Sequence, residues 1–178
     1  TVLQLIDRVK GERDMLLGDT EADQIHLAVR QTAKIPGDIA EVGVYQGGSS
    51  MLICKATGEK HLHLFDTFEG IPSVEKIDKF LEGQFASQLE ETRNYLKQEN
   101  NVHFYKGIFP DTAGPIEEKK FSFVHLDVDT YESTRNCIEF FYPRMNQGGI
   151  IISHDYIPAQ GVRKAFDEFF AEKTEPVI

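Results

Sequence analysis

The segment from residue 38 to residue 50 constrains the fold of this chain more than any other. It reads DIAEVGVYQGGSS, an apolar run that breaks into a glycine-rich turn. The apolar run predicts a buried strand, and the apolar residues 51–53 after the turn predict the start of a helix. Glycines let the backbone approach a ligand closely, and the free N–H groups at a helix start favour an anion. The segment therefore predicts a strand–turn–helix unit that holds an anionic group such as a carboxylate or a phosphate.

The spacing of the glycines limits which cofactor this turn can bind. Gly43, Gly47 and Gly48 follow the pattern G-x-x-x-G-G, whereas dinucleotide-binding turns use G-x-G-x-x-G. An NAD-dependent oxidoreductase is therefore a less favoured alternative. A second apolar segment, 61–65, ends in Asp66, and nucleoside-binding folds use an acid at the end of the second strand to bind the ribose hydroxyls. The two segments together predict a nucleoside-binding site.

Strand and helix patterns alternate along the rest of the chain. This order predicts one domain, 1–178, with a doubly wound α/β fold and a mostly parallel sheet. The predicted strands are 39–44, 61–66, 102–106, 121–127 and 149–154, and the predicted helices are 2–17, 20–34, 49–57, 84–98, 130–142 and 160–172. Two interpretations stay open for the long connection 67–83, which is either a lid or substrate wall, or an inert surface loop.

Acidic residues stand at the ends of three predicted strands. Asp66, Asp127 and Asp155 take these positions, and the carboxyl ends of parallel strands share the edge of the sheet where such folds bind ligands. Because neighbouring strands lie ~4.8 Å apart, the carboxylates of Asp127 and Asp155 are expected to converge. Two such carboxylates repel each other, and a bound divalent cation relieves the repulsion. The sequence therefore predicts a cation site at this edge.

The composition argues against several classes of protein. A net charge of −10 disfavours binding to nucleic acid or to an anionic membrane, which both require a basic face. The apolar runs are shorter than the ~18 residues of a membrane span, and Asp7, Arg8 and Lys10 interrupt the apolar start where a signal peptide would lie. Cys54 and Cys137 lack metal-ligand spacing and are interpreted as reduced core thiols. These features predict a cytoplasmic protein that binds neither nucleic acid nor membrane.

Five ordered segments carry a resemblance to a known family. They read GDIAEVGV (37–44), FDTFEG (65–70), HLDVDTYEST (125–134), YPRM followed by two glycines (142–149) and GVRKA (161–165). Together they resemble the class I S-adenosylmethionine (SAM)-dependent methyltransferases, and within that class the macrocin O-methyltransferase (TylF/MycF) family. This family methylates sugar hydroxyls of natural products. The resemblance extends over most of the chain, from about residue 30 to residue 172.

The resemblance implies SAM as the methyl donor and places it at the carboxyl ends of the first three strands. The residues expected to bind it are Glu41, Gly43, Tyr45, Gly47, Gly48, Ser49, Asp66 and Gly107. Glu41 matches an acid that orients the backbone and the methionine amine, Asp66 is expected at the ribose, and Gly107 near the adenine. Phe109 lies either beside the adenine or in the core. The N-terminal helices within 1–37 are expected to cover the cofactor edge.

The resemblance also implies a metal site and catalytic residues. In the family, the acid that matches Asp127 helps to bind magnesium and is placed to deprotonate the substrate hydroxyl. The family usually has two aspartates where this chain has His154 and Asp155. Three alternatives follow: a different metal such as Mn²⁺, a more weakly bound metal, or His154 as the base. The predicted ligands are Asp127, His154 and Asp155, and the predicted catalytic residues are Asp127 and His154. Asp129 is expected to cap the helix 130–142, with a direct role in function as the alternative.

The expected function is a SAM-dependent O-methyltransferase, assisted by Mg²⁺ or Mn²⁺, that acts on a hydroxyl of a sugar or another small natural product. The alternative from a different class is a non-catalytic module that binds SAM or another nucleoside. The final strand pair of the family is missing after Glu172. This end is interpreted as a truncation, or as a sheet edge that the second subunit of a homodimer covers.

Overall fold

The computed structural model of the chain describes residues 1–175, and residues 176–178 of the predicted domain lie outside the described part. The strands are β1 (Asp38–Val42), β2 (Leu62–Asp66), β3 (Val102–Lys106), β4 (Phe121–Leu126) and β5 (Met145–Ser153). The helices are α1 (Val2–Glu12), α2 (Asp19–Gln31), α3 (Gly48–Thr57), α4 (Leu89–Leu96), α5 (Tyr131–Phe141) and α6 (Gln160–Phe170), with short 3-10 turns η1 (Gly114–Ile116) and η2 (Tyr142–Arg144). Strand and helix therefore alternate as predicted, with boundaries that differ by a few residues.

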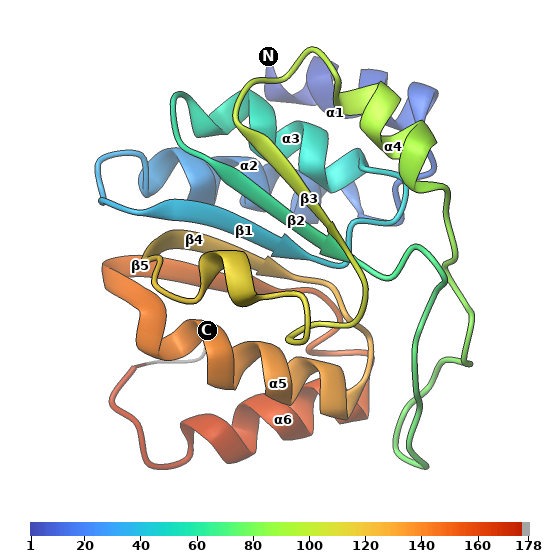
Figure 1. Ribbon diagram of the computed structural model, residues 1–178, viewed down its shortest axis with the longest axis vertical. Helices are drawn as coiled ribbons and strands as arrows, with labels where there is room; N and C mark the ends of the chain where they lie inside the picture. Colours follow the sequence, from blue (N-terminus) through green and yellow to red (C-terminus); the bar gives the residue numbers. More distant parts are fainter. Residues whose placement is uncertain (176–178) are drawn as a thin grey trace.

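The five strands form one parallel sheet with the order β3-β2-β1-β4-β5. Helices α1, α2 and α3 lie on one side of the sheet, and α5 and α6 lie on the other (Figure 1). This arrangement confirms the predicted doubly wound α/β fold. The strand order reverses between β1 and β4, and folds of this kind bind ligands beyond the carboxyl ends of the strands at such a reversal.

The core has two halves because successive side chains of a strand point to opposite faces. On one face, Ile39 of β1 and Leu64 of β2 belong to the same buried cluster as Leu52 of α3. On the other face, Val42 and Phe65 belong to a cluster with residues of α5 and α6. Strand positions that alternate with Val42 therefore face α3, and this decides where the polar residues of β1 point.

The first helix is shorter than predicted, since α1 ends at Glu12 and not near residue 17. The segment after α1 then packs against the glycine-rich turn. A Cβ atom at Gly48 would lie 2.8 Å from the Cβ atom of Met15, so a glycine at this position lets the two segments touch. Tertiary packing of residues 13–18 on the turn therefore replaces the last helical turn that the periodicity predicts.

The long connection between β2 and α4 is also longer than predicted, because α4 begins at Leu89 and not at residue 84. Its two arms pair with each other: the N–H of Ile71 donates to the carbonyl of Gln84 over 2.9 Å, and the N–H of Gly83 donates to the carbonyl of Ile71 over 3.0 Å. Its tip is fixed by Asp78, whose Oδ1 accepts from the N–H of Tyr131 at the start of α5 over 2.9 Å. The connection is therefore a paired segment docked at the carboxyl edge of the sheet (Figure 1).

The helices in residues 1–175 are too short or too polar for any of them to cross a lipid bilayer.

Candidate functional site

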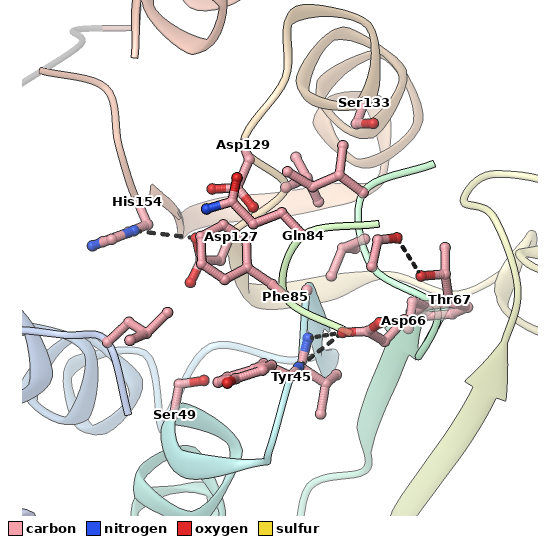
Figure 2. A pocket seen from close by; sticks show the side chains of 18 of the residues that line it. Tyr45, Ser49, Asp66, Thr67, Gln84, Phe85, Asp127, Asp129, Ser133 and His154 are labelled. Atoms are coloured by element: carbon pink, nitrogen blue, oxygen red, sulfur yellow. Dashed lines mark hydrogen bonds and ion pairs between the residues drawn. The ribbon is translucent and has the colours of Figure 1, made fainter. Parts of the chain in front are cut away.

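A cavity of about 310 Å³ opens at the carboxyl ends of β1, β2, β3 and β4. This size falls within the range of small-molecule sites. Two segments wall it: residues 14–17 between α1 and α2, and parts of the connection between β2 and α4, including Phe80 and Phe85. Of the two interpretations left open for 67–83, the structure favours the wall, because parts of this segment line the cavity. In Figure 2, Tyr45, Ser49 and Asp66 lie toward one end of the cavity, and Asp127, Asp129 and His154 lie toward the other.

The glycine-rich turn has a conformation that only glycine permits at its first position. Gly43 has a φ of +90°, and a Cβ atom there would lie 1.9 Å from the carbonyl oxygen of Asp127. Gly47, with a φ of +83°, is the N-cap of α3. Gly43, Gly48 and Ser49, which are predicted to bind the cofactor, line the cavity. Gly47, predicted likewise, does not line the cavity, and a Cβ atom there would lie against the side chains of Thr92 and Leu96.

Asp66 lines the cavity at the end of β2, and its carboxylate organises the turn. Its Oδ2 accepts from the backbone N–H groups of Val44 (2.7 Å) and Tyr45 (2.8 Å), and its Oδ1 accepts from the N–H of Phe68 (2.7 Å) (Figure 2). Burial raises the pKa of this carboxyl, and the three N–H groups act in the opposite direction. A carboxylate offers about four lone pairs. These three backbone N–H groups therefore occupy most of the lone pairs that the sequence interpretation assigned to the ribose hydroxyls.

Glu41, which the resemblance implies as a cofactor-binding residue, lies outside the lining of the cavity. Its side chain is fully buried on the α3 face of β1. Its carboxylate pairs with the hydroxyl of Ser50 and with the imidazole of His125. The alternation of β1 explains this position, because the residue that precedes Val42 must point away from the α5 side.

The end of β3 contributes the opposite wall. Gly107, with a φ of +139°, and Ile108 and Phe109 after it all line the cavity. Phe109 is also part of the core, since its ring stacks on Phe141 at 5.2 Å and meets Phe65 edge-on at 5.2 Å. Both interpretations of Phe109 are therefore compatible with its place. The adenine position beside Gly107 stays a prediction.

Three predicted residues converge at the ends of β4 and β5. Nδ1 of His154 lies 3.1 Å from Oδ1 of Asp127 and 3.5 Å from Oδ2 of Asp155. One ligand atom from each of the three lies within 4.8 Å of the others. Hydrogen bonds with the two carboxylates raise the pKa of His154 to about 11. The predicted convergence of Asp127 and Asp155 is confirmed, with His154 beside them.

This donor set fits a divalent cation by its chemistry. Two carboxylate oxygens suit Mg²⁺ and Mn²⁺, and the imidazole nitrogen favours Mn²⁺ or a later transition metal. His154 must lose its proton to act as a ligand, because only the neutral ring has a free lone pair. Nε2 of the same ring lies 3.7 Å from Oε2 of Glu21 at the start of α2, so a further carboxylate stands nearby.

Asp129 belongs to the site, a role that the sequence interpretation gave as the alternative to capping. The N-cap of α5 is Thr130, whose side chain accepts from the N–H of Ser133, so the expected role of Asp129 as the cap is wrong. Asp129 instead has a φ of +64° and lines the cavity. Burial and the neighbouring carboxylates of Asp127 and Asp155 raise its pKa to about 9. The spacing Asp127-Val128-Asp129 at a strand end was the available signal.

The cavity thus joins two chemical environments. One end offers the glycine-rich turn, with backbone N–H groups at the start of α3 for an anionic group. The other end offers three carboxylates and an imidazole, which can bind a cation and accept a proton. A ligand that lies across the cavity can present one reactive atom to the cluster of Asp127, Asp129, His154 and Asp155, which we call the acidic cluster.

Comparison with known proteins gives one consistent result. The family model described as macrocin-O-methyltransferase (TylF) matches residues 13–177. The chain is 33% identical over 140 residues to 8-demethyl-8-(2,3-dimethoxy-alpha-L-rhamnosyl)-tetracenomycin-C 4'-O-methyltransferase of Streptomyces olivaceus, which covers 68% of this chain and 54% of that protein. It is 30% identical over 156 residues to demethyldecarbamoylnovobiocin O-methyltransferase of Streptomyces niveus, with 78% of this chain and 60% of that protein covered.

Solved structures show the same fold. The O-methyltransferase NovP superposes with a TM-score of 0.75 at 28% identity, over 88% of this chain and 73% of that chain. A calicheamicin methyltransferase superposes with a TM-score of 0.78 at 18% identity, over 98% of this chain and 86% of that chain. The chain spans little more than half the length of the curated relatives named above.

Proposed function

Because the chain belongs to the macrocin-O-methyltransferase (TylF) family, we propose that it transfers the methyl group of SAM to a hydroxyl of a small-molecule acceptor. The observation that carries the proposal is the single cavity in which the glycine-rich turn and the acidic cluster face the same space. A methyl donor and an acceptor hydroxyl must meet in line, and a shared cavity supplies this proximity. The names of the relatives, all O-methyltransferases, agree with this reaction.

The glycine-rich turn supports a place for the amino-acid end of SAM. Gly43, Gly48 and Ser49 line the cavity where the first turn of α3 begins, and free N–H groups at a helix start stabilise a carboxylate. Tyr45 closes this end, since its hydroxyl donates to Oδ2 of Asp14 over 3.1 Å. The ribose is proposed beside Asp66, where the carboxylate has acceptor capacity left after its three backbone bonds. Glu41 would act on SAM indirectly, because its hydrogen bond to Ser50 helps to position the start of α3.

The acidic cluster supports metal assistance. Asp127, His154 and Asp155 would hold Mg²⁺ or Mn²⁺, and Asp129 lies beside Asp155. A bound cation would lower the pKa of a coordinated hydroxyl. The proton of the acceptor then needs a base at this end of the cavity.

Asp127 is the better candidate for this base. As a ligand, His154 would give a ring lone pair to the cation, and a nitrogen whose lone pair binds a cation cannot accept a proton. The carboxylate of Asp127 faces the cavity and needs no tautomer change to accept one. We therefore assign proton removal to Asp127 and metal binding to His154.

The acceptor is proposed to be a sugar hydroxyl or another hydroxyl of a natural product. The named relatives act on a rhamnosyl-tetracenomycin and on a novobiocin precursor. The wall of Leu16, Ile71, Phe80 and Phe85 is apolar and suits the carbon skeleton of such an acceptor. The homodimer and the cytoplasmic location stay predictions from the sequence.

The proposal is tested by calorimetry and by a transfer assay. S-adenosylhomocysteine (SAH) is expected to bind and NAD is not, and radiolabelled SAM is expected to label an acceptor from a cell extract. Binding of NAD instead of SAH contradicts the proposal. Binding of SAH without transfer in the presence of Mg²⁺ or Mn²⁺ favours the non-catalytic alternative.

A further inference from the structure

Three polar side chains are enclosed in the core beneath the glycine-rich turn. Glu41 of β1, Ser50 of α3 and His125 of β4 are each 0% exposed. The hydroxyl of Ser50 donates to Oε2 of Glu41, and Nδ1 of His125 lies 2.9 Å from Oε1 of the same carboxylate. Because a carboxylate only accepts, Nδ1 of His125 carries the hydrogen and donates it. One carboxylate thus links two strands and a helix.

The hydrogen-bonded group of Glu41, Ser50 and His125 lies next to the residues that form both ends of the cavity. Glu41 and His125 are register partners in the parallel pair of β1 and β4. Two residues further along each strand stand Gly43 and Asp127, and the carbonyl of Asp127 fills the space that a side chain at position 43 would need. Ser50 belongs to the first turn of α3, whose start lines the cavity. The three side chains therefore tie the cofactor turn to the strand end that carries Asp127.

A carboxylate buried at this place lowers the stability of the fold unless hydrogen-bond donors compensate it, since burial removes its hydration. Apolar residues of the same size would fill the space between β1, β4 and α3 without this cost. The ring of His125 depends on the same carboxylate, because its Nε2 is buried and has no hydrogen-bond partner among the described residues. Such a network has one arrangement that satisfies its donors, and it therefore fixes the relative position of the elements that carry it.

We propose that His125 is a positioning residue for methyl transfer. Its bond to Glu41, and through Glu41 to Ser50, holds the start of α3 at a fixed distance from the end of β4. This inference rests on the proposed function, because it assigns the methyl donor to the α3 end and the acceptor hydroxyl to the Asp127 end. Methyl transfer requires an in-line approach, and a displacement of about 1 Å between the two ends can cost about a hundredfold in rate.

The test compares two substitutions at His125 with a matched control. His125→Leu removes the donor to Glu41, whereas His125→Asn keeps an amide N–H near the position of Nδ1. The control is His63→Leu, because His63 is also a buried strand histidine, 2% exposed, but bonds to Asp38 and Tyr105 away from the cavity. For each variant, the melting temperature, the SAH dissociation constant, and kcat and KM for SAM are measured well below the melting temperature.

We expect His125→Leu to raise the SAH dissociation constant and to lower kcat by about tenfold or more each, and His125→Asn to recover both to within about threefold. His63→Leu is expected to leave both within about twofold at a comparable loss of melting temperature. Folded His125→Leu with wild-type kcat and SAH affinity overturns the inference while the proposed function stands. A wild-type protein that binds no SAH overturns both.

Ser50→Ala keeps the test decisive if His125→Leu does not fold. It removes the other donor to Glu41 with a change of one oxygen atom, and it is expected to weaken SAH binding about threefold to tenfold. Unchanged SAH affinity in a folded Ser50→Ala protein contradicts the linkage between the network and the cofactor turn.

Discussion

The substitution Asp66→Ala separates two roles for this carboxylate. In the sequence-based interpretation Asp66 binds the ribose, so its loss weakens cofactor binding and leaves the unliganded protein intact. In the structure, Asp66 accepts from the backbone N–H groups of Val44, Tyr45 and Phe68 before any ligand is present. Its loss then also destabilises the unliganded protein, because three partly buried N–H groups lose their acceptor.

The magnitude follows from the three bonds. A hydrogen bond to a charged group contributes about 1.5–3 kcal/mol, so the sum of three is an upper bound of about 9 kcal/mol. Asp66 lies at the cavity wall, where water replaces part of the lost bonds, and we expect a loss of about 3 kcal/mol in the free energy of unfolding. For a domain of this size, each kcal/mol lowers the melting temperature by about 2–4 °C, which gives a decrease of about 6–12 °C.

The assay is thermal unfolding without ligand, followed by calorimetry with SAH. Asp14→Ala serves as the control, because Asp14 also lines the cavity but its carboxylate accepts, among residues 1–175, only from the hydroxyl of Tyr45, over 3.1 Å. This control is expected to lose about 1 kcal/mol or less. An Asp66→Ala protein that melts like the wild type but binds SAH weakly would refute the role in the turn and restore the ribose-only interpretation.

Three further outcomes are expected. Asp127→Asn is expected to lower methyl transfer by about 10²–10⁴-fold while SAH affinity stays within about threefold, and excess EDTA is expected to abolish wild-type transfer until Mg²⁺ or Mn²⁺ is restored; full activity in EDTA contradicts the metal role. His154→Asp is expected to shift the metal preference from Mn²⁺ toward Mg²⁺, measured as the ratio of rates with the two ions, because the site then offers only oxygen ligands; an unchanged ratio means that His154 is not a ligand. Asp78→Ala is expected to accelerate proteolysis within residues 71–84 severalfold, since it removes the acceptor for the N–H of Tyr131 that fixes the tip of this segment; equal cleavage rates show that the paired arms alone hold it.

The architecture and the convergence of two distant acids could both be predicted from the sequence. Alternating strand and helix patterns lead to a parallel sheet, and in such a sheet the ends of strands share one edge. Asp127 and Asp155 could therefore be placed together from their positions after apolar runs, although 27 residues separate them in the chain. The glycine-rich turn was equally visible, because glycine is required where Gly43 lies against the carbonyl of Asp127.

The hydrogen-bond partners of the side chains at that edge could not be predicted in the same way, because they depend on the folded arrangement. Asp66 turns to the N–H groups of the neighbouring turn, and Asp129 enters the cavity because Thr130 caps α5 in its place. Glu41 lies beneath the turn because its partners, Ser50 and His125, come from α3 and β4. The physical reason is that backbone periodicity is a local property, which a sequence pattern records, whereas a polar side chain is satisfied by whichever donor or acceptor folding brings within about 3 Å.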